Sequence, residues 1–210
     1  MKEYWEKEDR FRGVGHPVVK TFVAQRIEFL RRHINFASVG RVLDVGCGNG
    51  ISAYYLQNLF TVTGLDNSKT LLHKNPCKNR VAGSAYDLPF KDSYFDLAYA
   101  WEVLHHLDNP LQAVAEMKRV SRRYLVLIEP NRNNIAQFLF ALLSPEHRLV
   151  FQYSRRFLDE LVNTLGLHII YTGTIGWIFP NLTPLPFLPI LSRLPFETRW
   201  GISNVVICKK

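Results

Sequence analysis

The sequence contains few cysteines, and they do not form the pattern of a metal site or of a disulfide framework. Cys47, Cys77 and Cys208 are an odd number, without a CxxC pair and without the cysteine–histidine spacing of a zinc site. We therefore predict no metal centre and a reducing, intracellular compartment. The first residues lack the apolar stretch of a signal peptide, so we expect a cytoplasmic protein.

Uninterrupted apolar runs long enough to cross a membrane are absent as well. The most apolar stretch, residues 177–196, is broken by five prolines, a density that excludes an ordinary transmembrane helix. Hydrophobic residues still make up 47% of the 210 residues and charged residues 21%, which predicts a folded core and not a disordered chain. No internal repeat is visible, and we expect one domain over residues 1–210.

Acidic residues are outnumbered by basic ones, and the formal net charge is +8. The basic doublets, at residues 31–32, 122–123 and 155–156, are scattered and form no dense block. This favours an ordinary basic, solvated surface over a nucleic-acid partner. A nucleic acid or an anionic membrane surface stays open as an alternative partner.

Short apolar runs alternate with helical segments along the chain. Helices are expected at residues 17–34, at 51–60, from Asn109 onward and at 154–165. Strands are expected at 41–45, 61–65, 80–84, 95–100, 124–128, 167–174 and 203–208. This alternation predicts an α/β fold: a seven-stranded, mostly parallel sheet with helices on both faces. The last two strands have no helix between them, so we expect the last strand to be antiparallel.

A glycine-rich turn follows the first predicted strand. Gly46, Gly48 and Gly50 allow a sharp turn and a close approach of the backbone to a ligand, and a predicted helix begins directly after them. Asp66 ends the next predicted strand about 20 residues further on, where a carboxylate can bind the hydroxyls of a ribose. The combination favours a ligand with an adenosine group. Dinucleotide-binding turns usually have the spacing GxGxxG, whereas this turn has GxGxG.

Residues 42–50, VLDVGCGNG, resemble the first motif of the class I S-adenosylmethionine (SAM) dependent methyltransferases. The resemblance extends from about Arg41 to Glu129. The segments GSAYDLPF and FDLAYAWEVLHHL look most like the small-molecule, quinone-biosynthesis-like branch, methyltransferase type 11. The resemblance implies a Rossmann-like fold, SAM as cofactor and methyl transfer as the reaction.

The resemblance also implies a set of cofactor-binding residues. Asp66 would hold the ribose hydroxyls, with Asn67 beside the adenine. Asp87 would accept a hydrogen bond from the adenine amino group, and Leu88 would cover the ring. Asp44 would reach the amino group of SAM. The full set is Asp44, Gly46, Cys47, Gly48, Asp66, Asn67, Asp87, Leu88 and Trp101.

Two further expectations concern the turn and a nearby cysteine. Cys47 would face the ligand with its backbone and not its sulfur, and a side chain at Gly46 would fill the space of the cofactor. The segment Asn75-Pro76-Cys77 is similar to the Pro-Cys nucleophile of cytosine C5 methyltransferases. It precedes the third predicted strand instead of following the fourth, which disfavours that role.

Candidate catalytic residues lie at the ends of the fourth and fifth predicted strands, where ligands bind in open α/β sheets. His105 and His106 follow the fourth strand, and either is a candidate general base near neutral pH. Glu129 ends the fifth strand and Glu102 follows the fourth. Each carboxylate is as compatible with fixing a loop as with orienting an acceptor.

Within the expected domain, we interpret residues 1–40 as an N-terminal helical cap and residues 41–130 as the SAM-binding core. Residues 131–152 and 177–200 fit no element of the basic unit and are interpreted as insertions on the acceptor side. Both insertions are apolar. This favours a small, partly hydrophobic acceptor, lipid-like or aromatic, and is compatible with peripheral contact with a membrane.

Three other functions fit part of the pattern. A non-catalytic SAM-fold binding or regulatory subunit is disfavoured by the intact cofactor motif, and a turnover assay decides it. A nicotinamide-dependent oxidoreductase is disfavoured by the GxGxG spacing and by the lack of a second nucleotide-binding half. An RNA methyltransferase would be consistent with the net charge of +8. The (D/N)PP(Y/F/W) motif of amino-group methylation on adenine or glutamine is absent. The sequence does not identify the acceptor, the acceptor atom or the oligomeric state.

Overall fold

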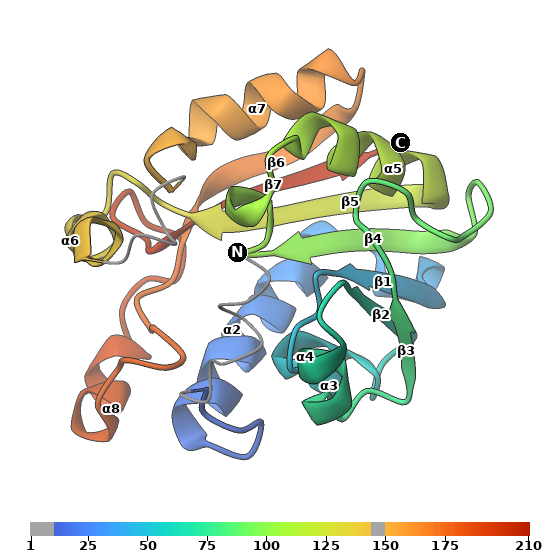
Figure 1. Ribbon diagram of the computed structural model, residues 1–210. Helices are drawn as coiled ribbons and strands as arrows, with labels where there is room; N and C mark the ends of the chain where they lie inside the picture. The colour runs from blue at the N-terminus through green and yellow to red at the C-terminus, as the bar shows by residue number, and fades with distance from the viewer. Residues whose placement is uncertain (1–10, 144–149) are drawn as a thin grey trace.

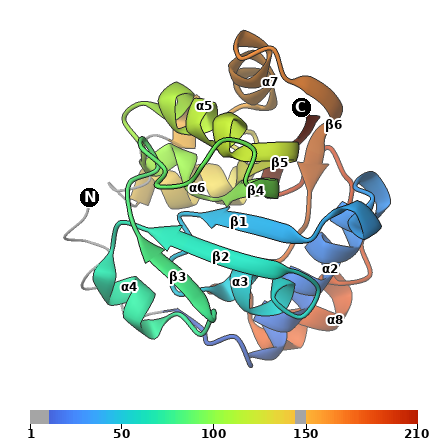
Figure 2. The same cartoon turned by 90° about the vertical axis from the view of Figure 1, so that its right-hand side faces the viewer.

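The computed structural model describes residues 11–143 and 150–210, and these residues form a seven-stranded sheet in the order β3-β2-β1-β4-β5-β7-β6. The first five strands pair in parallel, and β7 pairs antiparallel with both β5 and β6. Figures 1 and 2 show the sheet in two views that differ by a 90° turn about the vertical axis. The predicted α/β fold, mostly parallel with an antiparallel last strand, is confirmed.

The elements follow one another in the alternation that the sequence predicts. The strands are β1 (Arg41–Val45), β2 (Thr61–Asp66), β3 (Asn79–Ala82), β4 (Phe95–Trp101), β5 (Ser121–Pro130), β6 (His168–Ile175) and β7 (Ser203–Lys209). The described helices are α2 (Pro17–His33), α3 (Ile51–Leu56), α4 (Lys69–Lys74), α5 (Pro110–Val120), α6 (Ile135–Leu143), α7 (Arg155–Thr164) and α8 (Leu188–Leu191). Short 3₁₀ helices occur at Phe36–Ser38, Leu104–His106 and Leu185–Phe187.

Helices cover both faces of the sheet. In both views α5 and α7 lie on one face, and α2 and α3 lie on the other (Figures 1 and 2). The strands alternate accordingly, because successive side chains point to opposite faces. Leu43 and Ala98 belong to the core with α5 and α7, whereas Val42 and Leu97 belong to the core with α2 and α3.

Helix ends agree with local capping signals in the sequence. Asn109 caps α5 through a hydrogen bond from Gln112 N–H, with Pro110 at the first helical position. Ser154 caps α7 in the same way through Phe157 N–H, and Gly166, with φ of 65°, follows the end of that helix. These caps fix where the connections leave the sheet.

The two expected insertions both leave the sheet at the carboxyl ends of its parallel strands. In Figure 1 the arrows of β4 and β5 point toward the side on which α6 and α8 lie. Residues 1–10 of the expected N-terminal cap and residues 144–149 of the first insertion lie outside the described residues. In the part of the chain that the structure describes, no helix combines the length and the apolar character that a membrane span requires.

Candidate functional site

The glycine turn joins β1 to α3 and is shaped by three residues with positive φ. Gly46, Gly48 and Gly50 have φ of 70°, 49° and 81°, a left-handed conformation that glycine adopts without steric cost. The backbone N–H groups of Gly46 and Cys47 both donate to the carbonyl of Leu65, at 2.7 and 3.0 Å. The turn is therefore held against the end of β2.

Asp66 ties the end of β2 to the same turn. Its Oδ2 accepts the backbone N–H of Gly48 and its Oδ1 that of Ser68, both at 2.8 Å. Burial raises the pKa of Asp66, and these N–H donors oppose that rise. Asp66 thus fixes the turn. Each of its oxygens has a second lone pair, so the geometry is compatible with the expected contact to ribose hydroxyls.

The three glycines face different surroundings. A Cβ added at Gly46 would lie 2.5 Å from both γ carbons of Val103, and one at Gly50 would lie 2.1 Å from Oδ1 of Asn75. At Gly48 the nearest atom would be 4.0 Å away, on Leu71. A side chain at Gly46 would therefore meet the loop after β4, a contact that the sequence analysis did not anticipate. Of the three glycines, Gly48 is the one at which an added Cβ would make only an ordinary contact.

Asn75 is a structural partner of the turn that the sequence analysis did not assign. Its side chain is 1% exposed, and its Nδ2 donates to the Gly48 carbonyl at 3.0 Å and lies 3.3 Å from the Cys47 sulfur. Its Oδ1 accepts the N–H of Cys77 at 2.8 Å. Burial raises the pKa of both cysteine thiols, which disfavours the nucleophilic thiolate. The Asn75-Pro76-Cys77 segment therefore braces the glycine turn.

Asp44 precedes the turn and is buried. Its Oδ2 accepts a hydrogen bond from the Ser52 hydroxyl of α3 at 2.8 Å. Burial raises the pKa of Asp44 from 3.8 to about 7, and hydrogen bonding with Tyr99 and Ser52 opposes the rise. The Tyr99 hydroxyl is itself buried and, among the described residues, makes no hydrogen bond of normal geometry.

The segment that follows β3 carries Asp87 and Leu88. Asp87 is exposed and pairs with Ser84 in a short β-bridge. Leu88 is 2% exposed within the core with α5. Its side chain is therefore enclosed by protein, while Asp87 is open to a ligand.

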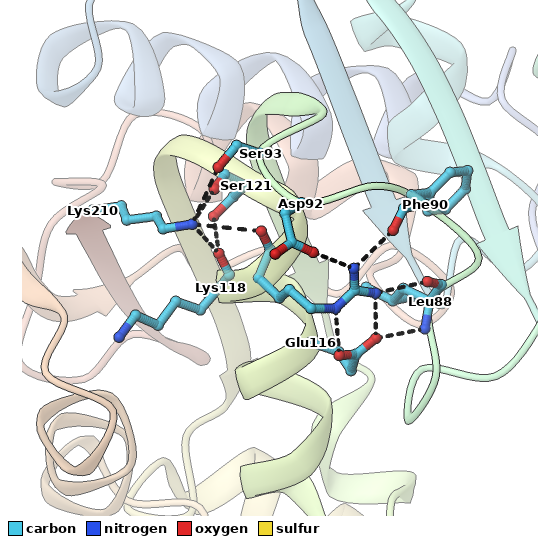
Figure 3. A network of polar contacts seen from close by, with 9 residues as sticks. Leu88, Phe90, Asp92, Ser93, Glu116, Lys118, Ser121 and Lys210 are labelled. Atoms are coloured by element: carbon cyan, nitrogen blue, oxygen red, sulfur yellow. Dashed lines mark hydrogen bonds and ion pairs between the residues drawn. The ribbon is translucent and has the colours of Figure 1, made fainter.

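A polar network fixes this segment on α5 (Figure 3). Arg119 donates to the carbonyls of Leu88 and Phe90, each at 2.8 Å, and pairs with Glu116 through two hydrogen bonds of 2.7 Å. Glu116 in turn accepts the backbone N–H of Leu88 at 2.8 Å. At the end of α5, Lys210 donates to the carbonyls of Lys118 and Ser121, each at 2.9 Å. The bonds from Arg119 and Glu116 hold Leu88 and Phe90, and with them the neighbouring Asp87, against α5.

Trp101 lies at the end of β4 and contacts α2. Its ring is 5.2 Å from that of Phe22, and the guanidinium carbon of Arg26 is also 5.2 Å from the Trp101 ring. Arg26 is completely buried, and its guanidinium donates to the Ser203 hydroxyl at 3.1 Å. Burial lowers the pKa of Arg26 to about 9. Trp101, an expected cofactor-binding residue, is therefore a half-buried residue at the carboxyl end of β4, packed against α2.

Glu102 faces the same buried arginine. Its φ of 55° is unusual for a residue with a side chain, and its Oε1 lies 3.4 Å from the Ser203 hydroxyl. Burial raises the pKa of Glu102 to about 6, and the charge of Arg26 opposes the rise. Such strained, charged positions are typical of functional sites. The link between Arg26 and Ser203 joins residues 177 apart in the chain, so no local sequence signal predicts it.

Glu129 and His105 form an enclosed pair. Glu129 Oε1 accepts the N–H groups of Val103 and Leu104 at 2.9 and 2.8 Å, and Oε2 lies 2.7 Å from His105 Nδ1. Glu129 is 0% and His105 1% exposed. Burial raises the pKa of Glu129 to about 8, against three backbone N–H donors. The pair holds the loop after β4.

His106 is the member of the histidine pair that reaches the surface. It is partly exposed, and its ring centre lies 3.8 Å from that of His105. Among the two histidines and Glu129, only His106 therefore combines accessibility with a place at the carboxyl end of β4. Within the described residues, no group of three or more His, Cys, Asp or Glu side chains is arranged to hold a metal ion.

The chain is similar to known proteins over this part of the fold. Residues 43–126 match a family model described as a methyltransferase domain. An uncharacterized methyltransferase of Schizosaccharomyces pombe is 36% identical over 101 residues, which cover 39% of this chain and 36% of that protein. The ubiquinone biosynthesis O-methyltransferase of Rickettsia typhi is 25% identical over 155 residues, which cover 70% of this chain and 63% of that protein. The chain thus matches less than two thirds of the length of either relative.

Solved structures share the whole arrangement. A SAM-dependent methyltransferase from Aquifex aeolicus superposes with a TM-score of 0.66 at 16% identity, covering 100% of this chain and 98% of the other. At that identity the likeness concerns the fold. The region of common sequence runs from β1 into β5 and includes the glycine turn, Asp66, Asp87 and the loop after β4.

Proposed function

We propose that the chain is a SAM-dependent methyltransferase of class I that transfers the methyl group of SAM to a small, partly hydrophobic acceptor, a proposal supported by the match to a methyltransferase family model. One observation carries the proposal: the turn between β1 and α3 is bonded, at its least crowded glycine, Gly48, to the carboxylate that ends β2. An adenosyl ligand at a parallel strand edge needs both a close backbone and an acid for its ribose.

The residues at this edge fit SAM. Asp66 offers lone pairs to the ribose hydroxyls, and Gly48 leaves room beside them. Asn67 and Asp87, which follow β2 and the end of β3, are the residues that we propose for the adenine, with Leu88 positioning Asp87 through its backbone. Asp44 is buried with a raised pKa, and the ammonium group of SAM would favour its charged form.

The chemistry divides between ligand and protein. When bound, SAM supplies a methyl group already activated by a cationic sulfur. The protein has to hold the acceptor's lone pair in line with that methyl group and to exclude water. We propose His106 as the base that takes the proton of a hydroxyl acceptor, because Glu129 and His105 are enclosed. Glu129 then acts as a positioning residue for the loop that carries both histidines.

The acceptor that we propose is hydrophobic. The segments that leave the sheet on the acceptor side expose apolar side chains, on α6 and in residues 182–194. The relative from Rickettsia typhi is named a ubiquinone biosynthesis O-methyltransferase, a name that indicates transfer to an oxygen atom. We therefore favour phenols and related enols with an apolar substituent over polar amines.

Calorimetry and a transfer assay test the two parts of the proposal separately. Titration with SAM and, in parallel, with NAD should give binding of SAM alone. Methyl-labelled SAM is then incubated with a short-chain prenylated phenol, the same phenol without the chain, a polar amine and RNA. We expect transfer to the prenylated phenol to be fastest. Transfer only to RNA, or binding of NAD in place of SAM, would refute the proposal.

A further inference from the structure

Helix α6 exposes its large apolar side chains and turns a polar side chain inward, the reverse of an ordinary surface helix. Its apolar residues Ile135, Phe138, Leu139 and Leu142 are 72, 43, 53 and 58% exposed and recur at the spacing of one helical face. We call these four residues the outer stripe. The inward positions include Gln137, which is 6% exposed. A soluble helix normally buries its apolar stripe.

The polar side of α6 fastens the helix to the protein. Asn134 Nδ2 donates to the Trp200 carbonyl at 2.7 Å, and Gln137 Nε2 donates to the Ile202 carbonyl at 3.2 Å. Asn131 adds a hydrogen bond from its Nδ2 to the Gly201 carbonyl at 2.8 Å. The orientation of α6 is thus set by hydrogen bonds to residues 200–202, the loop that leads into β7, and the outer stripe faces away from the core as a consequence.

A second exposed apolar segment lies on the same side of the molecule. Ile178 packs on α2, and Arg12 donates to the Thr183 carbonyl at 2.7 Å, which holds the segment in place. The outward residues of this segment are Leu182, Leu185, Phe187, Ile190 and Leu194, and Trp200 is exposed beside them. Both α6 and α8 project beyond the carboxyl ends of the strands (Figure 1).

The charged residues in the two described apolar segments are basic. Residues 131–143 and 177–196 contain no aspartate or glutamate. Their basic residues are Arg132 and Arg193, and Arg199 follows next to Trp200; all three are exposed. Glu197, which follows the second segment, pairs with Arg32 at 3.2 Å, and Glu146 lies outside the described residues. Within the described part of the two segments, an apolar surface edged by arginine complements the negative headgroups of a bilayer.

We propose that the outer stripe, together with Trp200 and the outward residues of 182–194, seats the protein on an anionic lipid bilayer. The apolar side chains enter the boundary between headgroups and acyl chains, and the arginines contact the phosphates. In this orientation the carboxyl ends of the strands face the membrane. The inference goes beyond the proposed function, because bilayer binding needs neither SAM nor an acceptor.

Co-sedimentation with vesicles tests the proposal. The full chain is mixed with vesicles of phosphatidylcholine and phosphatidylglycerol and, separately, with vesicles of phosphatidylcholine alone. We expect binding to the anionic vesicles that weakens as salt increases. The variant with Leu139→Ser and Leu142→Ser should bind at least about ten-fold more weakly. Wild-type protein that stays in the supernatant with anionic vesicles at low salt would overturn the proposal.

Matched variants separate this surface from general effects. Leu59 is 44% exposed and lies just before β2, at the opposite edge of the sheet, so Leu59→Ser should leave vesicle binding unchanged. Arg193→Glu with Arg199→Glu should weaken binding, whereas Lys78→Glu with Arg123→Glu, which change the charge equally at the amino ends of β3 and β5, should weaken it less. Equal losses in both pairs would show that net charge alone drives binding and would overturn the proposal.

Two further readouts keep the result interpretable. Circular dichroism and SAM calorimetry show whether each variant is folded and whether the cofactor site is intact, so a failure of vesicle binding is distinguishable from a failure of the proposed function. Sedimentation velocity shows whether the exposed surface instead joins two copies of the chain. A wild-type dimer that the Leu139→Ser and Leu142→Ser variant converts to monomers would overturn the bilayer proposal.

Discussion

Oε2 of Glu129 lies 2.7 Å from Nδ1 of His105, and both side chains are buried beneath the loop that follows β4. The contact joins the end of β5 to the residues just beyond β4. Glu129 also accepts three backbone N–H groups from that loop. A single carboxylate thus defines the shape of the segment on which His106 is carried.

Glu129→Ala should destabilise the protein strongly. The change leaves the buried donors of Val103, Leu104 and His105 without their acceptor, so we expect a loss of about 3–5 kcal/mol in the free energy of unfolding, measured in urea. Glu129→Gln keeps one oxygen as an acceptor and should lose less. Equal stability of the alanine variant and the wild type would show that the carboxylate does not hold the loop.

His106→Ala should slow the reaction without affecting folding. If His106 takes the acceptor's proton, kcat for a hydroxyl acceptor falls by about 10²–10⁴-fold, and the acidic limb of the pH–rate profile disappears. SAM affinity should be unchanged. His105→Ala, in contrast, should lower the melting temperature, because His105 is part of the buried pair. An unaltered pH–rate profile in His106→Ala would assign the base elsewhere.

Gly48→Ala and Gly46→Ala should fail in different ways. The added Cβ at Gly48 comes no closer than 4.0 Å to its nearest neighbour, Leu71, so the main stability cost is the positive φ, about 1–2 kcal/mol, while SAM binding is lost. At Gly46 the Cβ meets Val103, so stability falls further. Adding Val103→Ala should recover part of that loss. Thermal unfolding and calorimetry measure the two effects, and normal SAM binding by Gly48→Ala would place the ligand elsewhere.

Asp66→Ala should weaken SAM binding by about ten-fold or more, since the variant loses both the proposed ribose contact and the acceptor for Gly48 N–H. Analogues without ribose hydroxyls separate the two contributions. The wild type should discriminate against them, and the variant should bind both forms equally. Discrimination that persists in the variant would contradict the ribose contact.

The titration of Asp44 should make stability depend on pH. Its pKa is raised by burial from 3.8 to about 7 in the folded protein, so the folded state binds the proton more tightly than the unfolded chain. The resulting stabilisation is complete below about pH 4 and is lost as the pH rises through 7. Relative to Asp44→Asn, wild-type stability should fall by on the order of 2 kcal/mol between pH 5 and 8. Parallel curves would exclude a raised pKa.

Local signals account for most of the fold. A few neighbouring residues are enough to predict the strand that contains Asp44, the N-cap at Asn109 and the helix end at Gly166. The structure has each of these features. Helix α4 was not predicted, because its six residues contain only two apolar positions and show no period. Strand β5 begins at Ser121, three residues earlier than expected. Ser121 pairs with Phe95 of β4 through the backbone, and this pairing extends the strand beyond the apolar residues that predicted it.

The site was less predictable than the fold. The glycine turn follows β1 and Asp66 ends β2. Because these two strands are neighbours in a parallel sheet, the contact between the turn and Asp66 follows from the predicted strand order. The brace from Asn75 to Gly48 spans 27 residues, and nothing near Asn75 in the sequence indicates its partner. The enclosure of Glu129 likewise results from the packing of elements that are distant in the sequence. From residue type alone, Glu129 and His106 were equally good candidates for the catalytic base.

Strand β7 has a consequence for the order in which the protein folds. It comes after β6 in the chain, yet it lies between β5 and β6 in the sheet, so among the described strands β6 pairs with β7 alone. A growing chain cannot place β6 until residues 203–209 have been synthesised and have docked on β5. The β1–β5 half can assemble through short, sequential connections, whereas the last two strands join together in a late, non-local step.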